Sequence, residues 1–188
     1  EDASLVVDRD AAAQPRDAPP RLVQGDEPVV SADSVSISPT IVLRVRVGAD
    51  GSVRTEQLDD RNGDFPRIND AYAGTRNRYG YVAAMDPGPV ISVDGVTAWD
   101  LDAGTSETYR YGASTVAGEA VFAADPDGSA ENDGWLLNIV TDLADSTSRL
   151  VVLDARDVTA GPVAEVLLPQ RVPFGFHGNF LSGRGHLR

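Results

Sequence analysis

Residues 120–168 read AVFAADPDGSAENDGWLLNIVTDLADSTSRLVVLDARDVTAGPVAEVLL, and this stretch decides the fold. Four apolar runs in it are each long enough for one strand, and they cover residues 120–124, 135–142, 149–154 and 163–168. Turn-forming residues lie in each connection, among them Asp127-Gly128, Asp145-Ser146 and Gly161-Pro162. Four short antiparallel strands in about 45 residues have the size of one β-propeller blade. A chain of 188 residues holds roughly four such blades at most.

The preceding part of the chain also indicates strands. Residues 41–47 alternate, which predicts a strand with Ile41, Leu43, Val45 and Val47 on its buried face. The turn Ala49-Asp50-Gly51 then leads into a second strand over residues 52–58. We expect a loop over 59–78, turns at Asp94-Gly95 and 102–104, and strands over 79–84, 90–93, 97–102 and 107–111.

The first residues carry a weaker pattern. Residues 3–13 suit a helix or a strand equally well, and residues 14–40 are expected to form a long loop with a short edge strand. The chain has 22 Asp against 7 Glu, together with 18 Gly and 12 Pro. Because Asp, Gly and Pro favour turns over helix interiors, the composition predicts an all-β chain of short strands.

Charge and composition exclude several classes of function. With 16 basic and 29 acidic residues the net charge is −13, which disfavours nucleic acid and anionic membranes as partners. There is no cysteine for disulfides, thiolate metal sites or nucleophiles, and no lysine for a Schiff base or a phosphate-binding loop. No apolar run is long enough for a membrane helix, so we expect no transmembrane segment. The acidic composition favours a cytoplasmic location.

Only two histidines are present. His177 lies between glycines and phenylalanines in the stretch 172–180, VPFGFHGNF, where it suits a metal ligand or an acid–base group, or a core histidine bonded to a backbone carbonyl. His186 lies near the last residue between arginines and is expected to be exposed.

Two carboxylates have apolar neighbours. Asp64 precedes Phe65-Pro66-Arg67, and Glu119 precedes an apolar run; each suits a buried partner of a ligand histidine, or a turn or surface ion pair. The acidic stretch 125–134 has the composition of a calcium loop but lacks its glycine position and flanking helices. We therefore expect it to be a solvated connection between strands.

The chain resembles the carotenoid cleavage oxygenase family, which includes the stilbene-cleaving dioxygenases. The resemblance runs over residues 39–180, and its segments follow the family's order and close on Gly175-Phe176-His177-Gly178. It implies that residues 1–188 are the C-terminal portion of a seven-bladed β-propeller, roughly its last three to four blades. Residues 1–38 would be a loop and edge strand, and residues 181–188 a tail.

Members of that family hold a non-haem Fe(II) with four histidines and use O2 to split a carbon–carbon double bond of an apolar polyene or stilbene into two carbonyl products. By resemblance His177 is an iron ligand. The carboxylates of Glu119 and Asp64 would each accept a hydrogen bond from a ligand histidine and so orient its ring. Asp64 stands where the family usually has a glutamate, which is one methylene longer. Phe174, Phe176 and Phe180 would line a dry substrate cavity near the metal.

Three of the family's ligand histidines have no counterpart among these residues. The chain also starts at Glu1 rather than Met, so we expect further residues upstream. We expect the isolated chain not to bind iron tightly. A non-catalytic β-propeller-like binding module is the alternative, and an unrelated propeller is a third, although no blade signature repeats at a fixed period.

Overall fold

The computed structural model describes residues 3–10, 40–48, 50–86 and 92–182. The predicted loop over 14–40, apart from its last residue, lies outside these ranges, as does His186. Within them the chain forms antiparallel sheets and two single turns of 3₁₀ helix, η1 (Asp70–Tyr72) and η2 (Val158–Ala160). No helix of the described part is long and apolar enough to pass through a bilayer.

The first sheet has three strands in the order β1 (Ala3–Asp10), β2 (Thr40–Val47) and β3 (Val53–Gln57). Of the two alternatives for residues 3–13, β1 is the strand. The predicted hairpin between β2 and β3 is confirmed, and Gly51 has the positive φ of 79° that its turn requires.

The predicted buried face of β2 is wrong in its second half. Val47 is 48% exposed, whereas Arg44, on the face expected to be polar, is 6% exposed. Only the beginning of β2 reaches the second sheet, where Val42 packs with Trp99 and Leu101. The Arg44 guanidinium is buried there because it donates to the Leu101 carbonyl at 2.8 Å and pairs with a carboxylate of β3.

A second unit contains four antiparallel strands in sequence order, β4 (Gly63–Arg67), β5 (Tyr79–Asp86), β6 (Ser92–Asp100) and β7 (Thr105–Arg110). Two predictions are corrected here. The expected loop over 59–78 contains β4 and η1, and the expected turn at Asp94-Gly95 lies inside one continuous strand, β6. Gly95 sits where the β5–β6 register shifts, and a Cβ on it would collide with the Tyr109 carbonyl of β7. The glycine therefore permits close backbone approach at a bulge.

The third unit confirms the strands predicted from residues 120–168. Its strands are β8 (Thr115–Ala117), β9 (Val121–Ala124), β10 (Gly134–Asp142), β11 (Thr147–Asp154) and β12 (Pro162–Leu167). β8, which the sequence did not indicate, and β9 pair with opposite halves of β10. Together they behave as one inner strand that is interrupted between residues 117 and 121.

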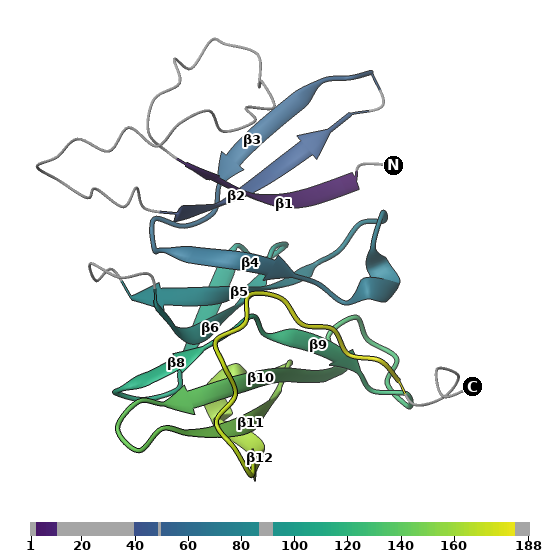
Figure 1. Ribbon diagram of the computed structural model, residues 1–188. Coiled ribbons are helices and arrows are strands. Elements are labelled where there is room, and N and C mark those ends of the chain that lie inside the picture. Colours follow the sequence, from purple (N-terminus) through teal and green to yellow (C-terminus); the bar gives the residue numbers. More distant parts are fainter. Residues whose placement is uncertain (1–2, 11–39, 49, 87–91, 183–188) are drawn as a thin grey trace, which may run out of the picture.

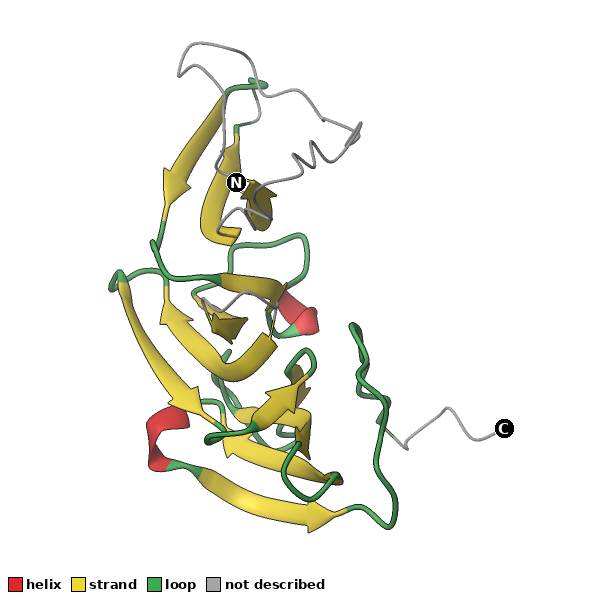
Figure 2. Ribbon diagram, turned by 60° about the vertical axis from the view of Figure 1, so that its left-hand side comes forward, coloured by secondary structure: helices red, strands yellow, loops and turns green. Residues whose placement is uncertain are grey.

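The units lie one after another along the molecule, as neighbouring propeller blades do (Figures 1 and 2). By hydrogen bonding the second and third units form one nine-stranded sheet in the described chain. A single residue pair between β6 and β8, Val93 opposite Ala117, connects the two. The main core lies between these units and includes Val96, Leu136 and Val140, which are at most 1% exposed.

After β12 the chain turns back and crosses the third unit toward β4 (Figure 1). We call residues 172–180 of this segment the strap. Its first residue is held to the sheet because the Val172 amide donates to the Ser148 hydroxyl at 2.9 Å. The strap carries the predicted site residues His177, Phe174, Phe176 and Phe180.

Candidate functional site

The interruption between β8 and β9 positions Glu119. Where the inner strand breaks, the side-chain Nδ2 of Asn138 on β10 donates to the Gly118 carbonyl at 3.1 Å and takes the place of a ladder bond. The next residue, Glu119, thereby turns its side chain under the strap, where only 5% of it is exposed. A buried carboxylate requires charged or hydrogen-bonding partners.

Three groups meet the Glu119 carboxylate. The Arg67 Nε lies 2.7 Å from Oε1, and Arg67 Nη2 donates to Oε2 at 2.9 Å. The Gly178 amide donates to Oε2 at 3.1 Å, and the His177 Nδ1 lies 3.5 Å from the same oxygen. Glu119 is thus held by a guanidinium on one side and by the strap on the other.

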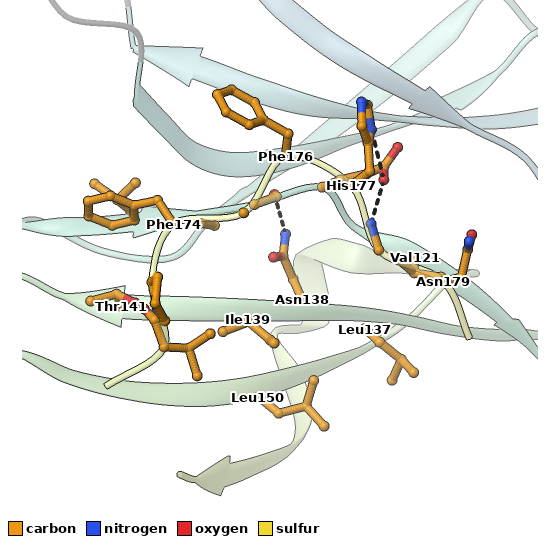
Figure 3. Close-up of a pocket in the computed structure, with 18 of the residues that line it drawn as sticks. Val121, Leu137, Asn138, Ile139, Thr141, Leu150, Phe174, Phe176, His177 and Asn179 are labelled. Carbon is orange, nitrogen blue, oxygen red and sulfur yellow. Dashed lines mark hydrogen bonds and ion pairs between the residues drawn. The ribbon is translucent and has the colours of Figure 1, made fainter. Parts of the chain in front are cut away.

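His177 is turned outward, with 73% of its side chain exposed. It is therefore not the core histidine that the sequence left open. Its ring packs edge-on against Phe65 at 5.4 Å between centroids. Its Nδ1 faces the Glu119 carboxylate (Figure 3). A carboxylate at Nδ1 favours the tautomer in which Nε2 carries the free lone pair, which is the form that binds metals.

Arg67 was not predicted to be a site residue, although it closes the stretch Asp64-Phe65-Pro66-Arg67. It lies at the end of β4, after a bulge in which Phe65 and Pro66 together oppose Val82. Phe65 there has a positive φ of 53°. Such a bulge redirects the following side chain, and Arg67 reaches the strap. Nothing in the local pattern shows that its partners lie 52 and 111 residues further along the chain.

Asp64 lies at the same bulge. Its Oδ1 accepts the Phe65 amide at 2.6 Å, so it stabilises the unusual backbone there. The described residues contain no second histidine for it to contact. Its role beside another ligand histidine stays a prediction.

A groove of about 380 Å³ lies between the strap and the face of β8–β11. Apolar side chains make up most of its wall, and they include Val121, Leu137, Ile139 and Leu150 from the strands (Figure 3). The strap contributes Phe174, Phe176 and Phe180, which are 55%, 73% and 47% exposed. Their role in a dry substrate cavity stays a prediction.

One residue that lines the groove, Asn138, belongs to a buried polar pair. Asn138, 3% exposed, donates to the Tyr111 hydroxyl at 2.9 Å. Burial raises the pKa of Tyr111 well above its usual range, so this hydroxyl is neutral at physiological pH. This pair therefore adds no charge beneath the groove, whose lining does include the Glu119 carboxylate.

The site residues fit one position of a metal centre. His177 offers an exposed imidazole with a carboxylate behind it, the arrangement typical of metal-binding histidines. Within the described ranges no three His, Cys, Asp or Glu side chains come together as a metal-binding group. Among the described residues, His177 is thus the one imidazole placed to bind a metal in this way.

Known proteins resemble this chain over most of its length. Residues 6–182 match the family model described as retinal pigment epithelial membrane protein. A chloroplastic 9-cis-epoxycarotenoid dioxygenase of Oryza sativa subsp. japonica is 44% identical over 149 residues, which are 75% of this chain and 23% of the rice protein. A carotenoid cleavage oxygenase of Mycobacterium tuberculosis is 36% identical over 137 residues, with coverages of 70% and 27%. The chain spans about a quarter of the length of these relatives.

Solved structures show the same likeness. A variant of Synechocystis apocarotenoid oxygenase superposes with a TM-score of 0.68 at 30% identity, and covers 74% of this chain and 30% of its own. The cobalt-substituted form of that enzyme gives a TM-score of 0.70 at 26% identity, with coverages of 93% and 36%. These neighbours are propeller enzymes. The prediction of an all-β part of a propeller is therefore confirmed.

Proposed function

Because the chain belongs to the retinal pigment epithelial membrane protein family, whose relatives here are carotenoid cleavage oxygenases, we propose that it is part of a longer non-haem Fe(II) dioxygenase. The enzyme would cleave a carbon–carbon double bond of an apolar conjugated substrate, a carotenoid, apocarotenoid or stilbene. Both atoms of O2 would enter the products, since one C=C bond and one O2 give two C=O groups. A cytoplasmic location stays a prediction.

The observation that carries this proposal is the contact between His177 and Glu119. The 3.5 Å between Nδ1 and the buried carboxylate leaves Nε2 directed away from Glu119. His177 would hold Fe(II) through Nε2, and Glu119 would keep the ring in one tautomer and orientation. Imidazole is a suitable ligand for iron, and bound Fe(II) would supply the activation of O2.

The groove supports an apolar substrate. Most of its lining is aliphatic and aromatic, and the buried carboxylate of Glu119 in it is paired with Arg67. A polyene requires such surroundings because it has no polar groups along its length. In the assembled enzyme, Phe174, Phe176 and Phe180 would exclude water from the reacting double bond.

The test uses the polypeptide that the native host produces, identified first by its intact mass. It is loaded anaerobically with Fe(II), given an apocarotenoid or a stilbene, and exposed to ¹⁸O2, and the carbonyl products are analysed by mass spectrometry. We expect carbonyl products that carry ¹⁸O from a polypeptide well above 19.9 kDa, and none from its His177→Ala variant. A host polypeptide of only 19.9 kDa that binds an apolar ligand without turnover would favour the non-catalytic binding module instead.

A further inference from the structure

The backbone N–H and C=O of Gly178, the neighbour of His177, both hydrogen-bond to the same ion pair. Its amide donates to Glu119 at 3.1 Å, and its carbonyl accepts from Arg67 Nη2, while Arg67 and Glu119 bond to each other. Arg67 also donates to the Asn179 side chain at 3.3 Å. One guanidinium therefore connects β4, the break between β8 and β9, and the strap.

The other contacts of the strap at this point include edge-on ring contacts of Phe176 and His177 with Phe65. His177 is 73% exposed, and the neighbouring Phe176 is equally exposed. Glycines at 175 and 178 leave the backbone around His177 without the restriction that a Cβ imposes. The ring contacts leave most of the imidazole exposed, so the charge-assisted bonds to a partly buried arginine are the stronger restraint on the strap.

We propose that Arg67 is a positioning residue that docks the strap and thereby sets the distance between His177 and Glu119. The planar fork of the guanidinium suits this task, because it spans both carboxylate oxygens and a strap carbonyl at once. The docking step depends only on the contacts above. Its effect on metal binding rests on the proposed function.

A matched control is available in Arg149. Its side chain is 20% exposed against 21% for Arg67, and it also pairs with one carboxylate, Glu165, and one backbone carbonyl, that of Tyr111. Arg149 connects β11 to β12, and neither of these partners lies in the strap. Arg67→Gln and Arg149→Gln therefore remove similar ion pairs at different places.

The first measurement is amide hydrogen exchange of the metal-free, full-length protein. Arg67→Gln should speed exchange of residues 176–180 on the order of 10- to 100-fold, and Arg149→Gln should leave these amides unchanged. Arg67→Lys should fall between wild type and Arg67→Gln, since lysine keeps the charge without the fork. If the strap amides of Arg67→Gln exchange at the wild-type rate, the inference is overturned.

The second measurement is the affinity for Fe(II) and the visible spectrum of the Co(II)-loaded protein, which reports ligand geometry. Arg67→Gln should weaken binding about 10- to 100-fold and change the cobalt spectrum, whereas Arg149→Gln should do neither. A loosened strap with unchanged affinity and spectrum would refute the positioning role. If wild type binds neither metal, the proposed function fails, and hydrogen exchange alone still decides whether Arg67 docks the strap.

Discussion

Asp100 closes the turn between β6 and β7. Its carboxylate accepts the Nε of Arg78 at 3.0 Å and Nη2 at 2.6 Å, and the amides of Asp102 and Ala103 at 3.1 and 3.0 Å. The hydrogen bonds from Arg78 are the main cause that lowers the pKa of Asp100 to about 2. All of these partners bind the charged form, so the turn is stabilised only while Asp100 is ionised.

This gives a pH dependence of defined sign. A carboxyl group with a lowered folded pKa stabilises the protein above its unfolded pKa of about 4 and loses that contribution as the pH falls toward 2. Asp100→Asn should therefore lower the urea midpoint at pH 7, and the difference from wild type should shrink between pH 4 and pH 2. Glu107→Gln, an exposed position on β7, is the control and should show no such trend. A difference independent of pH would contradict the assignment.

Glu119 gives a second prediction at this scale. Glu119→Gln keeps the size of the side chain and can still accept from Gly178, but it loses the charge that faces Arg67 and His177. In the full-length enzyme we expect iron affinity or turnover to fall about 10- to 100-fold, while His177→Ala should abolish both. Glu165→Gln on β12 serves as the control. Unchanged iron content and rate in Glu119→Gln would count against its role.

At the scale of elements, the sequence revealed strands where alternation is long and turns are conventional. β10 and β11 satisfy both conditions, and their pairing was predictable. β8 has three residues, and β4 contains a proline and a bulge, so neither shows a period of two. The site divides in the same way. The neighbours of His177 and Glu119 made them candidates and the family resemblance suggested their roles, whereas the importance of Arg67 depends on contacts across 111 residues.

Gly95 was expected in a turn, but it lies next to a bulge within β6. In Gly95→Ala the new Cβ would meet the backbone carbonyl of Tyr109 in β7, which cannot move without breaking the β6–β7 ladder. We expect a loss of about 1–3 kcal/mol in the free energy of unfolding. In Gly80→Ala on β5 the nearest atom would lie at 3.9 Å, so this variant should be close to wild type in chemical denaturation. Equal stability of the two variants would show that the bulge relaxes.

At the scale of the whole molecule, the second and third units are joined by few direct strand contacts and by long-range polar ones. Besides the single β6–β8 pair, the Glu131 carboxylate accepts the amides of Arg78 and Tyr79 at 2.8 Å each. The Arg67–Glu119 pair adds a link between β4 of the second unit and the break in the inner strand of the third. The site is thus a property of two units together.

The isolated 188 residues provide a test at this scale. The sequence contains two histidines, fewer than a four-histidine iron site requires. Anaerobic titration of the isolated chain with Fe(II), followed by equilibrium dialysis, should therefore give no tight equivalent. One tightly bound equivalent would show that this part of the protein assembles a metal site by other means.

The large sequence separation between Arg67 and the strap also has a consequence for biosynthesis. The sheets of the second and third units form mainly between strands that are near in sequence, so they can fold while translation continues. The strap follows β12 and leaves the ribosome after them, and its bonds to Arg67 close a loop of 111 residues. His177 is therefore expected to reach its place late, after the strands of both units have paired.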